Sequence, residues 1–215
     1  MPILVKDAYS NGNAKYAFSL RDRDLSNDRR AAFVNVNITD LVPTTSIYGA
    51  GIRTIRDFDG AVVYLADVYV EPNWPDFVDY STTNQDGIVL DGAAEVYGSN
   101  VTIHNWNSDA AIDNKATISQ FVGLTTSGSG FRAMRYWRDG PHYLVDSQID
   151  TSNGTSVWFR ECDTVELYVY NTTFNGSSTL EPDNYRWDRG SSPTIIYLDS
   201  DPREAGVMYP MFTSH

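Results

Sequence analysis

Three arginines fall within seven residues of this chain, at Arg132, Arg135 and Arg138. The stretch around them, residues 131–143, also holds several aromatic rings and His142, one of only three histidines. A guanidinium group can hold a carboxylate through two parallel hydrogen bonds. Histidine and tyrosine side chains can exchange protons with a bound ligand. The types and spacing of these residues therefore predict a site for an acidic ligand.

A second charged cluster precedes these arginines in the sequence. Asp109, Asp113 and Lys115 would share one face if residues 108–115 are extended. At a rise of ~3.3 Å per residue, the Cα atoms of Asp109 and Asp113 would lie ~13 Å apart. That is too far for the ~5.5 Å carboxyl pair of a retaining glycosidase, and an inverting pair would need the side chains to converge. The alternative is a simple ion pair between Asp113 and Lys115.

The composition argues against several classes of protein. A chain of 215 residues suits one domain, or two small ones, with a real hydrophobic core. Its formal net charge of −12 repels a polyanion, so nucleic acid is not an expected partner. Cys162 is the only cysteine, which argues against an intrachain disulfide or a cysteine-based zinc site. No apolar run is long enough for a membrane span, and no signal peptide is visible at the start.

Apolar and polar residues alternate over short stretches that are separated by Gly, Asn, Asp, Ser and Thr. This pattern predicts strands joined by turns, with little helix. Residues 1–30 are polar and rich in turn signals, which predicts an irregular opening. The predicted strands are 33–39, 61–70, 88–90, 95–97, 101–103, 110–112, 118–122, 131–136, 143–145, 156–159, 166–170 and 194–198.

Residues 71–80 contain two prolines, which argue against a central strand and predict a projecting loop. The loop carries Trp74, Phe77 and Tyr80. Aromatic rings exposed on a loop can stack against sugar rings, and they can equally cover the end of a core. We take Trp74 as a candidate substrate-binding residue.

Three segments resemble one another: "VTIHN" at 101–105, "LVDS" at 144–147 and "LYVYN" at 167–171. Aligning Ile103 with Val145 and Val169 gives a period of about 21–25 residues, as in a β-solenoid. These segments resemble coils of the right-handed parallel β-helix proteins, the pectate-lyase-like superfamily. The resemblance covers residues 88–180 and, more weakly, 33–70, and it implies about six to eight coils. The alternative fold is an antiparallel jelly roll or sandwich, which also has regularly spaced short strands.

The resemblance implies a function that involves polysaccharides, because many family members are lyases, hydrolases or esterases of acidic glycans. Others are tailspikes or non-catalytic surface proteins. In a lyase, Arg132 or Arg138 would clamp a uronate carboxylate, which makes the neighbouring C5 proton more acidic. Tyr136 or His142 would then act as the base or the acid.

A hydrolase would instead use carboxyl groups as general acid and base, with Asp109, Asp113, Asp139 and Asp146 as the candidates. Asp109 and Asp113 could also hold Ca²⁺, although no cofactor is required. Further candidates for contact with the substrate are Arg135, Trp137 and Tyr143.

Alternation along an extended strand places Arg132, Tyr136 and Arg138 on one face and Arg135 and Trp137 on the other. One face packs inside, so not all three arginines can meet a ligand. The alternative is structural: the arginines satisfy carbonyls and aspartates at coil corners, and Trp137 and Tyr143 are packing residues. We expect His142 near the surface because it follows the turn signal Gly140-Pro141.

These patterns predict a single β-helix domain over residues 1–215, with 1–30 as an N-terminal cap or arm and 181–215 as a C-terminal cap. The expected function is binding of a polysaccharide, with its cleavage by a lyase or hydrolase reaction left open. The alternative is a non-catalytic structural or adhesive solenoid that assembles through its ends or sides. We expect an extracellular, cell-surface or virion-associated location. An open groove that holds Asp113 with Arg132 or Arg138 favours an enzyme, whereas burial of these groups at corners favours a scaffold.

Overall fold

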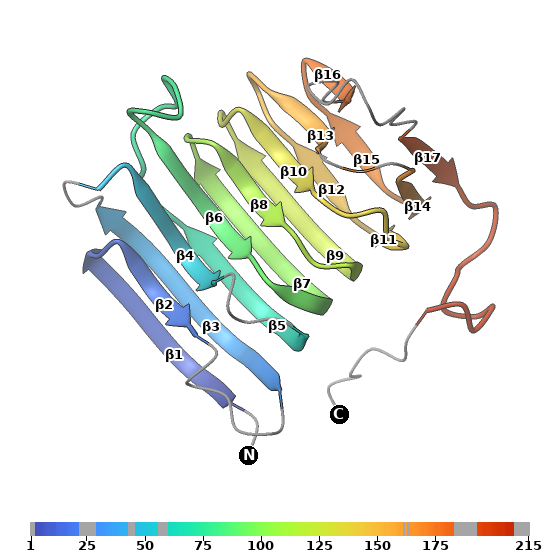
Figure 1. Ribbon diagram of the computed structural model, residues 1–215, viewed down its shortest axis with the longest axis horizontal. Helices are drawn as coiled ribbons and strands as arrows, with labels where there is room; N and C mark the ends of the chain where they lie inside the picture. Colours follow the sequence, from blue (N-terminus) through green and yellow to red (C-terminus); the bar gives the residue numbers. More distant parts are fainter. Residues whose placement is uncertain are drawn as a thin grey trace.

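The computed structural model describes residues 3–21, 29–42, 46–55, 60–160, 162, 164–182 and 193–208. This part of the chain forms strands and contains no helix. The strands lie in two sheets that face each other across the core (Figure 1). Every pairing between described strands is parallel, so the alternative prediction of an antiparallel jelly roll or sandwich is wrong.

The larger sheet, sheet A, has ten strands in the order β1-β3-β5-β7-β9-β11-β14-β17, with β12 and β15 continuing it beside β9. Its strands are β1 (Ile3–Asn13), β3 (Arg30–Val42), β5 (Ala61–Glu71), β7 (Ala93–Trp106), β9 (Ile118–Gly128), β11 (His142–Val145), β12 (Gln148–Asp150), β14 (Glu166–Tyr170), β15 (Thr173–Asn175) and β17 (Thr194–Tyr197).

The smaller sheet, sheet B, has seven strands in the order β16-β13-β10-β8-β6-β4-β2. Its strands are β2 (Tyr16–Leu20), β4 (Tyr48–Thr54), β6 (Asn84–Leu90), β8 (Ala110–Asn114), β10 (Arg132–Tyr136), β13 (Thr155–Phe159) and β16 (Ser178–Pro182). The chain passes from one sheet to the other and back, and each passage adds one coil of a β-solenoid.

The long strands of sheet A are bent, and the bend keeps both halves of each strand facing the core. In β3, Phe33 and Val36 are both buried although they have opposite parity, which strict alternation forbids. Asn35 between them has φ 52°, and this left-handed residue shifts the alternation by one. Asp67 has φ 53° and lies at the same register position of β5.

The bend residues form a ladder, with one member in each of seven successive coils. All have positive φ, a region that Asn, Asp and Gly tolerate best. The members are Asp7, Asn35, Asp67, Asn100, Gly123, Asp146 and Asn171. In three of the adjoining Asp–Asn pairs the amide donates to the carboxylate at 2.7 Å, as from Asn100 Nδ2 to Asp67 Oδ1. Each aspartate of the ladder therefore accepts a hydrogen bond from an asparagine of the next coil.

The predicted coil period holds for the second half of the chain. Sheet B register aligns Ile88, Ile112, Met134, Val157 and Leu180, so the spacings are 24, 22, 23 and 23 residues. The earlier coils are longer, since Phe18, Ile52 and Ile88 are 34 and 36 residues apart. These longer coils are why the repeat is weak before residue 88.

The coil alignment predicted from sequence was wrong in register. Ile103 pairs with Thr126, which pairs with Ile149, so Val145 is not its equivalent. Ile103 follows the bend residue of its coil, Asn100, whereas Val145 precedes the bend residue of its own coil, Asp146. The alignment of apolar residues therefore matched segments on opposite sides of the bend.

Most predicted strands are confirmed, although 95–97 and 101–103 are parts of the single bent strand β7. The prediction of an irregular opening was wrong, because residues 3–13 and 16–20 are β1 and β2 of the first coil. The turn signal at Asn11-Gly12 coincides with a register shift between Ser10 and Gly12, so it produces an irregularity within β1.

The predicted C-terminal cap, residues 181–215, lies partly outside the described residues. Its described part adds β17 to sheet A and then returns over that sheet, where Met208 packs with Tyr143 and Val145. Arg203 anchors this return with an ion pair of 2.6 Å to Asp146 of the ladder.

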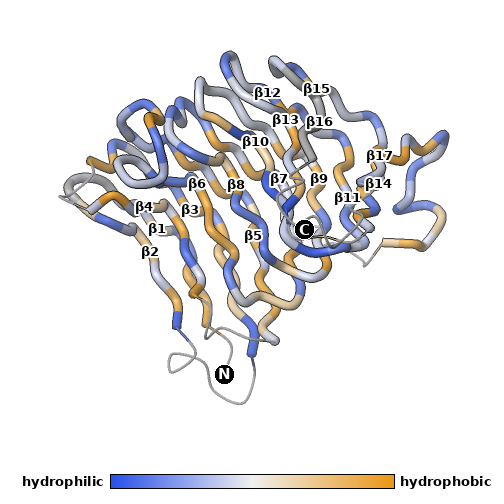
Figure 2. Tube along the Cα trace, turned by 45° about the horizontal axis from the view of Figure 1, so that its top comes forward, coloured by the Kyte–Doolittle hydropathy of each residue, from blue (hydrophilic) through white to orange (hydrophobic). Residues whose placement is uncertain are grey.

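Hydrophobic segments follow the strands, and hydrophilic ones gather at many of the turns (Figure 2). No helix in the described residues could cross a membrane.

Candidate functional site

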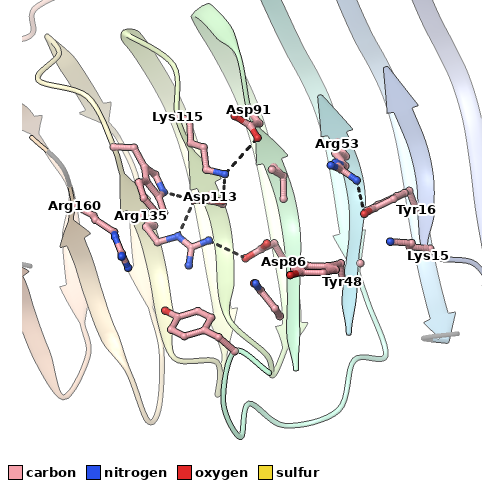
Figure 3. A pocket seen from close by; sticks show the side chains of 15 residues that line it. Lys15, Tyr16, Tyr48, Arg53, Asp86, Asp91, Asp113, Lys115, Arg135 and Arg160 are labelled. Carbon is pink, nitrogen blue, oxygen red and sulfur yellow. Dashed lines mark hydrogen bonds and ion pairs between the residues drawn. The ribbon is translucent and has the colours of Figure 1, made fainter. Parts of the chain in front are cut away.

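A groove crosses the outer face of sheet B, with a cavity volume of about 580 Å³. Its lining comes from β2, β4, β6, β8 and β10, and from Arg160 just after β13 (Figure 3). The groove therefore runs across the strands, along the axis of the solenoid. Adjacent strands lie about 4.8 Å apart, so a groove that spans β2 to β13 is about 24 Å long.

Strand register explains how residues distant in sequence meet on the floor of the groove. Five successive strands carry one outward-facing row, whose members pair in turn: Arg53, Val89, Asp113, Arg135 and Trp158. Each coil contributes one side chain to this row. The candidate site is arranged along this row of side chains.

Arg135 is the centre of a buried cluster of carboxylates. Its Nε donates to Asp113 Oδ1 at 2.7 Å, and its Nη1 donates to Asp109 Oδ2. Its Nη2 also lies 3.8 Å from Asp86 Oδ1. The Asp109 and Asp113 side chains, predicted to be ~13 Å apart at Cα, are thus joined through one guanidinium group.

The three aspartates differ in protonation because their partners differ. Burial by itself would raise the pKa of Asp113, but the positive charges of Arg135 and Lys115 outweigh it and lower this pKa to about 2. Burial raises the pKa of Asp86 well above its ordinary value, and Arg135 offsets only part of that rise. Burial also raises the pKa of Asp109. The pKa values of two carboxyl groups that line the same groove, Asp86 and Asp113, are therefore shifted in opposite directions.

Lys115 and Trp137 complete the surroundings of Asp113. Lys115 Nζ lies 3.3 Å from Asp113 Oδ2 and 3.5 Å from Asp91 Oδ2. Trp137 Nε1 donates to Asp113 Oδ1 at 2.6 Å. The ion pair considered as the structural alternative for Asp113 and Lys115 is therefore present, and it lies within the groove.

Arg132 and Arg135 contact the same carboxylate, so the predicted division of this strand into two faces was wrong. Arg132 Nη1 lies 3.8 Å from Asp109 Oδ1 and donates to Tyr80 Oη at 2.7 Å. Its guanidinium packs on Trp158, 4.1 Å from the ring centroid. Alternation breaks because the consecutive residues Ala133 and Met134 both pack in the core.

Two predicted proton-transfer residues lie inside the core and cannot touch a ligand in the groove. Tyr136 is fully buried. His142 is also fully buried, which contradicts its predicted surface position: Nδ1 lies 2.9 Å from Ser119 Oγ and Nε2 lies 2.9 Å from the Arg138 carbonyl oxygen. Burial lowers the pKa of His142 to about 4.

The predicted stacking role of Trp74 was also wrong. Its side chain is only 3% exposed, and its Nε1 donates to the Asp86 carbonyl oxygen at 3.0 Å. Trp74 therefore fastens its loop to β6. Tyr80, from the same loop, is 41% exposed and lines the groove.

The remaining predicted residues lie elsewhere. Arg138 is exposed, and its Nη1 donates to the Trp137 carbonyl oxygen. Asp139 is exposed and accepts the Thr164 amide. Tyr143 and Asp146 belong to sheet A, so none of these four lines the groove.

The sequence did not reveal seven of the charged or aromatic residues that line the groove: Lys15, Tyr16, Tyr48, Arg53, Asp86, Asp91 and Arg160. Lys15 Nζ lies over the rings of Tyr16 and Tyr48, at 5.3 and 5.4 Å from their centroids. Arg53 lies over Tyr16 and donates to its hydroxyl. These residues could be found from the sequence only by aligning the strands of sheet B coil by coil. That alignment requires the lengths of the first coils.

At the other end of the groove, Arg160 lies over two indole rings, 5.1 Å from the centroid of Trp137 and 5.6 Å from that of Trp158. Both ends of the groove therefore combine cations with aromatic faces.

The candidate calcium ligands Asp109 and Asp113 both accept hydrogen bonds from Arg135. Among the residues described, no group of three or more His, Cys, Asp and Glu is arranged to hold a metal ion.

Comparison with known proteins gives no match to a family model, to a curated protein or to a solved structure.

Proposed function

We propose that this chain is a right-handed parallel β-helix protein that binds an extended acidic polysaccharide in the groove of sheet B. The observation that carries the proposal is the concentration of positive charge there. In a chain with net charge −12, five of the 16 lysines and arginines line this groove against three of the 28 aspartates and glutamates: Lys15, Arg53, Lys115, Arg135 and Arg160 against Asp86, Asp91 and Asp113. A local cationic surface on an acidic protein directs an anionic ligand to one place.

The shape of the groove fits a linear polymer. It extends along the solenoid axis and is open to solvent at Tyr48 and Tyr80, which are 49% and 41% exposed. Tyrosine and tryptophan rings offer flat apolar faces with polar edges, which suit the faces and hydroxyls of sugar rings. Tyr16 and Trp137 provide such rings near opposite ends.

Cleavage of the polymer is the second candidate function, favoured by the contrast between Asp86 and Asp113. Environments that push the pKa values of two carboxyl groups apart are typical of acid–base pairs. Asp86 would protonate the glycosidic oxygen of the leaving sugar, and Asp113 would stabilise the positive charge that develops on the other sugar ring. A water molecule would then add to the anomeric carbon of that ring and return its proton to Asp86. A binding protein without cleavage remains the alternative, because Asp113 is fully engaged by Arg135, Lys115 and Trp137.

Titration calorimetry with polygalacturonate and with dextran, a neutral polymer, tests the binding proposal. We expect binding of polygalacturonate alone, with an affinity that falls as salt is added, because the ion pairs are screened. Equal binding of both polymers, or binding of neither, would overturn the proposal.

Release of reducing ends tests cleavage. Asp86→Asn keeps the shape of this side chain but cannot donate the proton, so it should bind polygalacturonate normally and release no reducing ends. Activity in Asp86→Asn would remove Asp86 as the acid. Binding without cleavage by the unmodified protein would leave the non-catalytic alternative.

A further inference from the structure

Two cations at the β2–β4 end of the groove, Lys15 and Arg53, lie against aromatic rings, as Figure 3 shows. Lys15 Nζ lies 5.3 Å from the ring centroid of Tyr16 and 5.4 Å from that of Tyr48. Arg53 Cζ lies 4.7 Å from the Tyr16 centroid. A ring face attracts a cation but carries no net charge. The cluster of Lys15, Tyr16, Tyr48 and Arg53, which we call the tyrosine subsite, therefore holds two positive charges.

Neither cation of the tyrosine subsite is paired with a carboxylate among the described residues. No Asp or Glu oxygen in this part of the chain lies within 4.0 Å of Lys15 Nζ or of a guanidinium nitrogen of Arg53. Both side chains are also partly exposed, so a ligand in the groove can reach them. Their charges are therefore available to an anionic group of that ligand.

Two other cations of the groove, Lys115 and Arg135, are bound to carboxylates of the protein. Arg135 is only 4% exposed. Between them, these two side chains contact four aspartates: Asp86, Asp91, Asp109 and Asp113. An anionic group of a ligand would have to compete with these aspartates for the same donors, which disfavours its binding at Lys115 or Arg135.

The guanidinium group of Arg53 is held at one nitrogen. Its Nη1 donates to Tyr16 Oη, whereas its Nε and Nη2 donate to no acceptor among the described residues. These two nitrogens form the edge of a guanidinium that can hold a carboxylate through two parallel hydrogen bonds. Tyr48, at the same end of the groove, is 49% exposed, so its ring offers a flat apolar surface to a sugar.

We propose that the tyrosine subsite binds the carboxylate of one acidic sugar of the glycan, and that Lys115 and Arg135 hold the carboxylates of the protein instead. Arg53 donates to the ligand carboxylate through Nε and Nη2, Lys15 supplies the second positive charge, and the sugar ring lies against Tyr48. This inference rests on the proposed function, because it assigns the acidic group of that glycan to one part of the groove.

The test changes the ligand and the protein together. Carboxyl-reduced polygalacturonate keeps the linkage of polygalacturonate but has an uncharged hydroxymethyl group in place of each carboxylate. Lys15→Gln combined with Arg53→Gln should bind polygalacturonate about tenfold more weakly than the unmodified protein does. The same variant should bind the reduced polymer as the unmodified protein does. Arg53→Lys alone keeps the charge and loses the two-pronged hydrogen bonding, so its affinity for polygalacturonate should lie between the two.

The control removes two cations outside the groove. Lys6→Gln combined with Arg138→Gln makes the same change of net charge at exposed positions, and it should bind both polymers like the unmodified protein. Thermal unfolding of each variant verifies that it is folded under the conditions of the titration.

The outcomes separate the two proposals. Failure of the unmodified protein to bind polygalacturonate would overturn the proposed function, and this inference with it. Full affinity of the Lys15→Gln, Arg53→Gln variant for polygalacturonate would overturn the tyrosine subsite and leave the proposed function in place. An equal loss in the control, or an equal loss of affinity for the reduced polymer, would also overturn it, because the subsite would then not act on the carboxylate.

Discussion

Arg135 Nε donates to Asp113 Oδ1 at 2.7 Å across the adjacent strands β10 and β8. The two residues are 22 positions apart in the chain, about one coil, and they pair directly in the sheet. The guanidinium also serves Asp109 and lies near Asp86. One arginine therefore balances the carboxylates of two successive coils.

Replacing Arg135 should strongly destabilise the protein. Arg135→Met leaves buried carboxylates without their cation, and removal of one partner from a buried ion pair costs about 3–5 kcal/mol. Urea unfolding measures the loss. Arg138→Ala is the matched control, because Arg138 is exposed and a surface substitution changes stability by about 0.5 kcal/mol or less. Similar losses in the two variants would contradict the role given to Arg135.

His142 should make the protein less stable as the pH falls from about 6.5 to about 4. Burial lowers its pKa from 6.5 to about 4 in the folded chain, so the unfolded chain binds a proton that the folded chain refuses over this range. The free energy of unfolding therefore decreases as the pH falls, by on the order of 3 kcal/mol at the acid end.

The raised pKa of Asp86 acts in the opposite direction, since it stabilises the folded chain at low pH and this contribution is lost as the pH rises. The measurement is therefore a difference: the free energy of unfolding of the unmodified protein minus that of His142→Gln, from pH 4 to pH 8. This difference should decline toward acid. A difference that stays constant with pH would show that His142 titrates normally.

The ladder predicts opposite tolerance of two substitutions at Asn100. Asn100 has φ 53°, where alanine pays a steric cost of about 1–2 kcal/mol and glycine does not. Asn100→Ala should therefore lower the free energy of unfolding by more than Asn100→Gly, although both lose the hydrogen bond to Asp67. If Asn100→Gly proved the more destabilising variant, the left-handed backbone conformation would not explain why Asn occupies position 100.

Trp74 and Tyr48 should separate stability from binding. Trp74→Ala removes a buried indole and should cost about 3–5 kcal/mol of stability. Tyr48→Ala removes a ring that is 49% exposed in the groove, so it should leave stability nearly unchanged and weaken glycan binding. Thermal unfolding and glycan titration of the two variants check both halves. A stable Trp74→Ala with weakened binding would restore the stacking role for Trp74.

Local sequence pattern was enough to predict a chain of short strands with little helix. Alternation in stretches such as 33–39 and 61–70 identifies strands, and the short coils after Ile88 show the repeat directly. The parallel arrangement is consistent with these regular coils. The first two coils span 34 and 36 residues, so their repeat could not be seen and β1 and β2 were missed.

The candidate site was predicted only in part, because it depends on register between coils. The proximity of the Asp109–Lys115 segment to the arginines was predicted, since these segments are one coil apart. The contribution of Asp86 and Arg53 was not, because their alignment requires the lengths of coils that the sequence does not reveal. The burial of His142 depends on Ser119, a neighbour from the preceding coil, so a local turn signal could not predict it.

The central claim, that the groove of sheet B binds an acidic glycan, is tested most directly by the affinity for polygalacturonate of a groove variant and of a charge-matched control. Arg53→Ala combined with Arg160→Ala removes two cations that line the groove. Lys6→Ala combined with Arg138→Ala removes two exposed cations outside it. We expect the groove variant to bind about tenfold or more weakly and the control to bind like the unmodified protein. Equal affinities for all three proteins would contradict the account.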